Sequence, residues 1–165
     1  MASMSFSMQV ADFIAKTKGN VDLVTRAITL KVDNKVMHRS PVGDAKYWKH
    51  KPPPGYTGGR FRANWQLSIG SPTAGVRDLI DKDGSATIAA HGSTISAAKA
   101  GDVIYLVNNL PYAKRIEEGW SRQAPVGVVM LTVVEFRTIV DNAVNGVRNG
   151  TSATDFAQGY KTYGL

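Results

Sequence analysis

The feature that most constrains the fold of this chain is a long amphipathic pattern between Asn20 and Ser40. Apolar side chains recur there at steps of three and four residues, which is the spacing of one helical face: Val21, Val24, Ile28, Val32 and Val36. Asn20 suits the N-cap position, and Asp22 lies in the first turn, near the positive end of the helix dipole. Ser40-Pro41 ends the pattern because the residue before a proline avoids the helical region. The sequence therefore predicts a helix from about residue 20 to residue 40.

Two further segments have weaker helical patterns. Residues 8–16 predict a short N-terminal helix that stops at Gly19, before the long helix begins. Residues 85–101 are rich in alanine and predict a helix that Gly92 interrupts.

The middle of the chain contains breakers and strand patterns. Residues 41–59 cannot form a regular element, because three consecutive prolines favour an extended conformation and the flanking glycines permit turns. Residues 60–70 alternate apolar and polar side chains, which predicts a half-buried strand. Residues 102–109 are rich in β-branched and aromatic residues and predict a second strand, whereas residues 76–81 predict only a weak one.

Residues 126–149 give conflicting signals. The stretch VGVVMLTVV has strand propensity, yet apolar residues continue beyond it at helical spacing until Asn149-Gly150 supplies a stop. A strand of this length would be abnormal, so we predict one long C-terminal helix. The order of the elements then predicts an α+β fold, in which a small, mainly antiparallel sheet packs with a long N-terminal and a long C-terminal helix.

Composition removes several classes of protein. The chain has 165 residues and no cysteine, which excludes disulfides and thiolate-bound metals. No window has the roughly 18 consecutive apolar residues of a membrane helix, and the N-terminus lacks the pattern of a secretory signal, so we expect no membrane contact. We expect one domain over residues 1–150, which carries the Pro-rich loop at 41–59, and a C-terminal tail at 151–165.

Familiar catalytic and cofactor patterns are absent from the sequence. The histidines at positions 38, 50 and 91 have no metal-site spacing, and no phosphate loop, dinucleotide fingerprint or nucleophile elbow occurs. Glu117 and Glu118 are adjacent, and adjacent side chains on a helix point about 100° apart, so they cannot flank one substrate. One of them can instead pair with Lys114 or Arg115. We therefore expect no enzyme activity, no cofactor and no metal.

The densest stretch of the sequence is YLVNNLPYAKRIEEGWSRQAP, at 105–125. It predicts the end of a strand, a turn, and a short helix that starts at Pro111 and stops at Gly119. An apolar face with a rim of both charge signs is typical of a contact between subunits, although a core-facing helix would look the same. The predicted anchors are Tyr112, Ile116 and Trp120, and the predicted polar rim consists of Arg115, Glu117, Glu118 and Arg122.

A local basic patch lies at residues 46–62 of a chain whose formal net charge is +7. Its aromatic side chains could stack on bases while its cations neutralise phosphates. The alternative is a loop that lies against a neighbouring subunit, and we favour this alternative because the basic character is confined to one loop. The candidate contacts with DNA or a partner are Lys46, Trp48, Lys49, Lys51, Arg60 and Arg62.

These stretches together resemble a known family. The segment SPVG…WK…PPPGYTGGRFRANWQLSIG and the later segment AGDVIYLVNNLPYAKRIEEGWSRQAPVGVVMLTVVEF resemble the tail-completion or neck proteins of long-tailed bacteriophages, the minor tail protein Z-like family. The resemblance covers residues 40–136, and residues 44–56 lengthen a segment that is contiguous in many relatives.

The resemblance implies a small α+β structural protein of the virion, without catalytic activity, assembled in the cytoplasm of the bacterial host. Such a protein forms a ring, expected to be a hexamer, at the junction between the tail tube and the capsid connector. The implied partners are the tail terminator, the head-side connector or stopper, and the end of the tape-measure protein. Several basic copies around a channel would also contact the passing DNA without sequence specificity.

Overall fold

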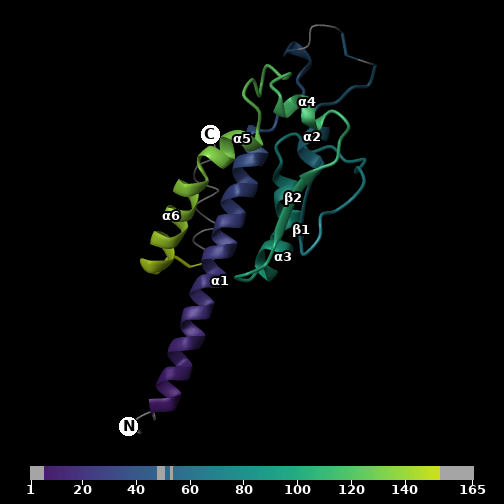
Figure 1. The fold of residues 1–165 in the computed structure, drawn as a ribbon. Coiled ribbons are helices and arrows are strands. Elements are labelled where there is room, and N and C mark those ends of the chain that lie inside the picture. The colour runs from purple at the N-terminus through teal and green to yellow at the C-terminus, as the bar shows by residue number, and fades with distance from the viewer. Residues whose placement is uncertain (1–5, 48–50, 53, 153–165) are drawn as a thin grey trace.

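The protein is built around one long helix, and the other elements pack against the C-terminal half of that helix (Figure 1). The computed structural model describes residues 6–47, 51–52 and 54–152. Helix α1 (Phe6–Arg39) lies between helix α6 (Phe136–Arg148) on one side and helix α3 (Ser85–Ala97) with a two-stranded sheet on the other. The described chain thus mixes helices with an antiparallel sheet, as predicted, and its N-terminal helix is long.

Helix α1 is one continuous helix of 34 residues and not the two helices that the sequence predicted. The predicted stop at Gly19 and the predicted N-cap at Asn20 are wrong, because both residues lie inside the helix. A single glycine costs a helix only about 1 kcal/mol relative to alanine, which the turns on both sides can outweigh. The predicted end at Ser40-Pro41 is confirmed, and the Ser40 hydroxyl donates to the Val36 carbonyl at 2.7 Å.

The main core forms where the last turns of α1 meet the sheet and the loops around it. Val36 and Met37 of α1 are buried there together with residues that come from four other segments: Phe61, Trp65, Leu110, Ala124 and Val128. A smaller cluster joins α1 to α6 through Ala27 and Ala143, whose small side chains let the two helix backbones approach closely. The two clusters fix the sheet and α6 on different sides of α1.

The sheet consists of β1 (Trp65–Ile69) and β2 (Ile104–Asn108), which pair antiparallel. The second strand is confirmed within its predicted range, but the first begins later than predicted. Residues 60–63 form the short helix α2 (Arg60–Ala63) instead, because Gly59, with φ of 105°, turns the chain immediately before them.

The weak strand predicted at residues 76–81 is wrong, because this segment has no strand partner. The Asn64 side chain satisfies its backbone instead: the amide oxygen accepts from the Arg77 N–H at 2.7 Å, and the amide nitrogen donates to the Arg77 carbonyl at 3.0 Å. Helix α3 is confirmed, but it continues through Gly92 without the predicted interruption.

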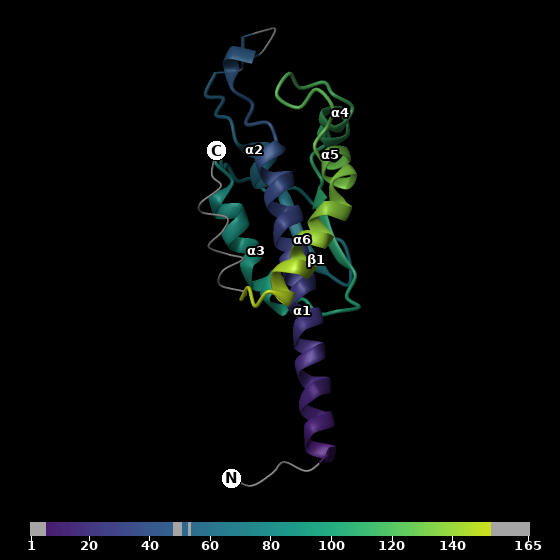
Figure 2. The same ribbon diagram turned by 90° about the vertical axis from the view of Figure 1, so that its left-hand side faces the viewer.

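The C-terminal segment is helical, as predicted in preference to strand, but the single long helix is wrong. Helix α5 (Val129–Val134) and helix α6 are separated at Glu135, which has φ of −88° and ψ of −1°. The Glu135 carboxylate bonds Lys35 and Arg39 of α1, and this pairing holds the break against the central helix. The break lets α5 cover the C-terminal end of α1 while α6 runs back along its side (Figure 2).

The tail predicted from residue 151 lies outside the described residues from 153 onward. No helix in the described part of the chain is both long enough and apolar enough to cross a lipid bilayer.

Candidate interaction groove

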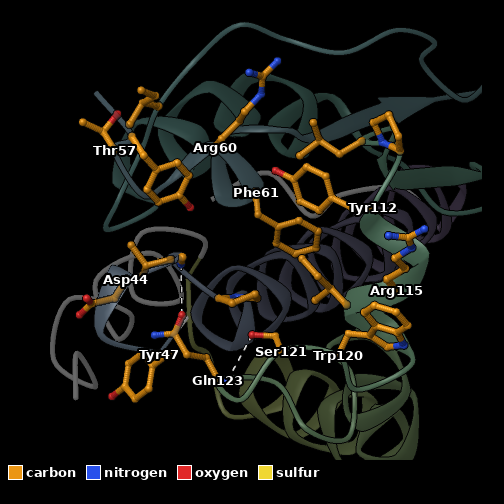
Figure 3. Close-up of a pocket in the computed structure, with 18 of the residues that line it drawn as sticks. Asp44, Tyr47, Thr57, Arg60, Phe61, Tyr112, Arg115, Trp120, Ser121 and Gln123 are labelled. Atoms are coloured by element: carbon orange, nitrogen blue, oxygen red, sulfur yellow. Dashed lines mark hydrogen bonds between the residues drawn. The ribbon is translucent and has the colours of Figure 1, made fainter. Parts of the chain in front are cut away.

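The two segments that the sequence singled out separately lie around one open groove of about 1410 Å³ (Figure 3). The loop that follows α1 forms one wall and contributes Tyr47, Lys51 and Tyr56. The segment around helix α4 (Ala113–Glu117) forms the other wall and contributes Tyr112 and Arg115. Phe61 of α2 lies between the two walls, with its ring centroid 6.2 Å from that of Tyr112.

The structure brings most of the predicted contact residues to this groove. Five of the seven predicted interface residues line it: Tyr112, Arg115, Ile116, Trp120 and Arg122. Lys51 and Arg60 line it from the loop side. Trp48 and Lys49, which the sequence placed in the same contact set, lie outside the described residues.

The predicted anchors of the α4 segment do not share one helical face. Helix α4 is shorter than predicted and begins after Tyr112, and Gly119, with φ of 83°, ends it as predicted. Ile116 packs partly against the core, whereas Trp120 lies beyond the helix with 73% of its surface exposed. The Arg115 guanidinium stacks over the Trp120 ring at 5.1 Å, so an apolar and a cationic surface are presented together.

The two adjacent glutamates have different partners. Glu118 lies 3.8 Å from Lys114 in an exposed pair of the kind that the sequence predicted. Glu117 instead accepts hydrogen bonds from three successive backbone N–H groups at the start of α5: Val128 at 2.9 Å, Val129 at 2.9 Å and Met130 at 2.8 Å. Burial alone would raise the pKa of Glu117, but these three donors outweigh it and lower the pKa below its ordinary value of 4.5.

We expect Glu117→Ala to lower the free energy of unfolding by about 1–2 kcal/mol, because it removes the acceptor that caps α5. The matched Glu118→Ala should change it by less than about 0.5 kcal/mol, since an exposed ion pair contributes little. Because the folded-state pKa of Glu117 is lowered, its contribution is complete above about pH 4.5 and is lost as the pH falls through the folded-state pKa. Urea unfolding at pH 7 and at pH 3 measures both effects, and equal losses for the two variants at pH 7 would contradict the capping role.

The cations of the predicted basic loop are partly used inside the protein. Arg62 donates to the carbonyls of Ser40 at 2.9 Å, Lys82 at 2.7 Å and His38 at 3.3 Å, so it fastens the C-terminal end of α1. Lys46 pairs with Asp44 at 3.1 Å, and Arg60 lies 3.8 Å from Asp78.

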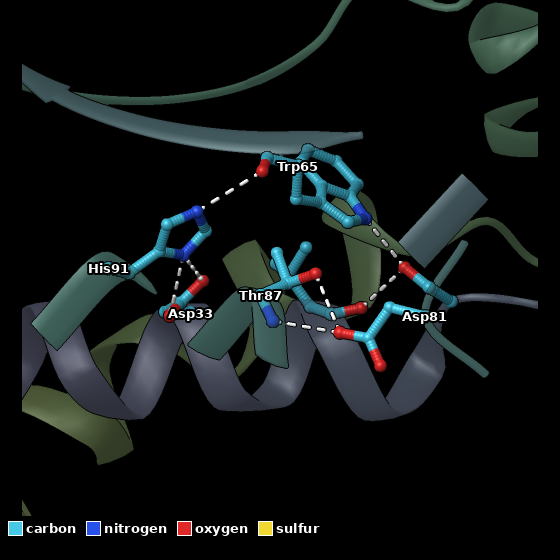
Figure 4. Close-up of polar contacts among 7 residues, drawn as sticks. Asp33, Trp65, Asp81, Thr87 and His91 are labelled. Carbon is cyan, nitrogen blue, oxygen red and sulfur yellow. Dashed lines mark hydrogen bonds and ion pairs between the residues drawn. The ribbon is translucent and has the colours of Figure 1, made fainter. Parts of the chain in front are cut away.

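Sequence reasoning missed a buried polar cluster that holds α3 in place (Figure 4). His91 Nδ1 lies 3.0 Å from both oxygens of Asp33, and its Nε2 lies 3.1 Å from the Trp65 carbonyl. In the same cluster, the Asp81 carboxylate accepts from the Thr87 backbone N–H at 2.8 Å and from the Thr87 hydroxyl at 2.7 Å. The sequence signal that could have indicated this cluster is Asp33, a charged residue in the stretch of α1 that also carries the apolar residue Val36.

This cluster is closed to solvent, since Asp33 is 0% and His91 is 3% exposed, and neither residue lines the groove. His91 therefore joins α1, α3 and β1 and offers no accessible base. Among the described residues, no group of three or more metal-ligating side chains comes together.

Comparisons of the chain with protein-family models, with curated proteins and with solved structures find no match.

Proposed function

We propose that this protein is a structural component of the virion of a long-tailed phage, where it completes the head-proximal end of the tail and helps to join the tail to the capsid connector. The sequence resemblance to tail-completion and neck proteins motivates the location. The observation that carries the role is the groove, in which the α4 segment and the loop after α1 present one continuous contact surface. In this role the protein acts by packing, without catalysis and without a cofactor.

The size and lining of the groove support a macromolecular occupant. Pockets for small ligands measure about 300–1,000 Å³, and this groove is larger and open to solvent. Trp120, Tyr112 and Arg115 are residue types that contribute most to protein interfaces. Among the described residues, the carboxylates that line the groove are Asp44 and Asp78, and each is close to a cation, which makes them poor candidates for a general base.

The assembly that we propose is a ring of identical copies, a hexamer in keeping with the sixfold tail. Its neighbours are the tail terminator, the head-side connector or stopper, and the end of the tape-measure protein. The ring forms in the bacterial host cytoplasm and remains in the neck of the virion. Lys51, Arg60 and Arg122 give the groove a positive surface that favours an acidic partner segment.

Immunogold labelling of purified particles tests the location. Antibody against this protein is expected at the joint between head and tail, and label on the capsid, on the tail tip or on no particle would contradict the proposal.

The groove is tested by complementing a phage that lacks this protein with the Trp120→Ala variant. We expect joined particles to fall by about tenfold or more, because the loss of an exposed aromatic anchor costs about 2 kcal/mol of binding. Leu79→Ala is the matched control, because Leu79 is an exposed apolar residue that does not line the groove and should leave joining unchanged. Equal yields from the two variants would contradict the role of the groove.

The alternative is a nucleic-acid-binding module that uses the loop at residues 46–62. The convergence of Lys51 and Arg60 on the groove favours it, while the internal contacts of Arg62 reduce the cations that are free to bind phosphate. Affinity for duplex DNA, measured across a range of salt concentrations, distinguishes the two functions. A steep loss of affinity with salt indicates phosphate contacts, and a flat or absent response favours the protein partner.

A further inference from the structure

The first part of α1 projects from the rest of the protein as a stalk, which we define as residues 8–21 (Figure 2). The described side chains of the stalk are all exposed, whereas burial begins in the turn that follows. A helix of this length is marginal in water by itself, and most of the stability of helices in proteins comes from packing of an apolar face. We therefore expect the stalk to pack against a partner.

The stalk carries an apolar face that continues the face buried by α6. Val10, Phe13, Ile14 and Val21 follow the spacing of Val24 and Ile28, which pack in the cluster between α1 and α6. Phe13 is 70% exposed. The same stripe thus forms a helix–helix contact in one half of α1, whereas in the other half it is exposed and no described segment packs on it.

A second exposed apolar surface lies on α5, at the opposite end of α1. We call it the α5 patch, and it consists of Val129, Met130, Val133 and Val134. Val134 is 74% exposed, and helix α5 contains no charged residue. Of its six side chains only Thr132 is buried, so α5 uses a narrow face for its own core.

The stalk cannot reach the α5 patch of its own chain. Lys35 of α1 contacts Glu135, the residue directly after α5. Ile14 lies 21 positions earlier on the same straight helix, which corresponds to about 30 Å at a rise of 1.5 Å per residue. Contact between the two surfaces therefore requires a second copy.

Charge favours the α5 patch over the groove as the site for the stalk. The stalk carries Lys16 and Lys18 beside its apolar face and one carboxylate, Asp12, so its net charge is positive. The described residues that line the groove include four cations, Lys51, Arg60, Arg115 and Arg122, against two carboxylates, Asp44 and Asp78, so the groove has a net positive charge that disfavours the stalk. The uncharged α5 patch carries no such penalty.

We propose that the stalk of one copy packs on the α5 patch of the next copy, so that copies associate head to tail. Because the contact joins two different surfaces, each copy offers one of each, and association proceeds to a ring when the rotation closes. The inference rests on the proposed function only in that a neck protein is expected to form a ring, and it names the surfaces that build it.

Complementary charge variants test this contact on the purified full-length protein. Phe13→Asp disables the stalk and Val134→Asp disables the α5 patch; both positions are exposed, and circular dichroism checks that the fold is retained. At about 0.1 mM, sedimentation velocity should show wild type above the mass of a monomer and each variant as a monomer, with Kd raised at least about 30-fold. An equimolar mixture of the two variants should form a one-to-one dimer, because one intact stalk then meets one intact patch.

Other pairings give different results and overturn the inference. If only Phe13→Asp is monomeric, the stalk pairs with another stalk or with the groove, and Trp120→Asp then separates these two cases. If only Val134→Asp is monomeric, the patches pair with each other. A wild type that stays monomeric at this concentration also overturns the head-to-tail contact, while immunogold labelling of particles still tests the location in the virion.

Engineered cysteines provide a second readout, because the natural chain contains no cysteine. Ile14→Cys in one preparation and Met130→Cys in another should give a disulfide-linked dimer under mild oxidation only when the two are mixed. Efficient linking within the Ile14→Cys preparation alone would indicate a stalk–stalk contact and contradict the proposal.

Discussion

Replacing Asp33 with alanine is expected to lower the free energy of unfolding by about 3–5 kcal/mol, a loss typical of removing one partner of a buried pair of ionisable side chains. The Trp65 carbonyl requires a hydrogen on Nε2 of His91, and a second hydrogen must lie between Nδ1 and the Asp33 carboxylate. Without Asp33, the imidazole loses the partner of Nδ1 in a site from which water is excluded.

Asp12→Ala is the matched control for this prediction, because Asp12 lies on the same helix and is exposed. It should change the free energy of unfolding by less than about 0.5 kcal/mol. Equilibrium unfolding in guanidinium chloride measures both variants. A double-mutant cycle with His91→Ala should show strong coupling, because either single change leaves the other residue without its partner. Losses that simply add would contradict a coupled pair.

Local patterns predicted the elements that are built from regular local packing. The stripe at Val24, Ile28 and Val36 predicted the packed half of α1, and the β-branched run predicted β2. The end of the short helix at Gly119 was also predicted, because a glycine can adopt the positive φ that ends a helix without help from distant residues. Each of these features depends on residues that are close together in the sequence.

The errors arise where contacts from distant residues decide the local structure. The break between α5 and α6 is held by Lys35 and Arg39, about 100 positions before Glu135. Glu117 was predicted to be part of a polar rim, but in the structure its carboxylate also caps the N-terminus of α5. Neither partner can be found from spacing, because the partners meet only once the chain has folded.

The groove illustrates the same limit for the candidate site. Its two walls were singled out as separate candidates, and the sequence offered no reason to place them together. Phe61 explains their proximity, because this residue was predicted on a strand and instead projects from α2 between them. The start of α2 depends on one residue, Gly59.

Gly59→Ala is expected to lower the free energy of unfolding by about 3 kcal/mol or more, through backbone strain and a steric clash. Gly59 has φ of 105°, which residues with a side chain rarely adopt. A Cβ atom there would lie 2.8 Å from the Asp81 carbonyl carbon and 2.8 Å from the Lys82 nitrogen. Both are backbone atoms, so relief requires the segment to move.

Gly70→Ala separates the strain from the clash, because Gly70 has φ of 86° but nothing within 4 Å of the added carbon. Its cost should be about 1–2 kcal/mol, the strain alone. The additional loss of stability in Gly59→Ala, compared with Gly70→Ala, measures the cost of disturbing a close contact between chain segments. At this contact the Gly59 N–H donates to the Val42 carbonyl, and the Gly59 carbonyl accepts from the Asp81 N–H. Val42 and Ile80 line the groove, so Gly59→Ala should also weaken partner binding at temperatures where the variant is still folded. Equal losses in stability for the two alanine variants, measured by urea unfolding, would show that the groove wall does not depend on this contact.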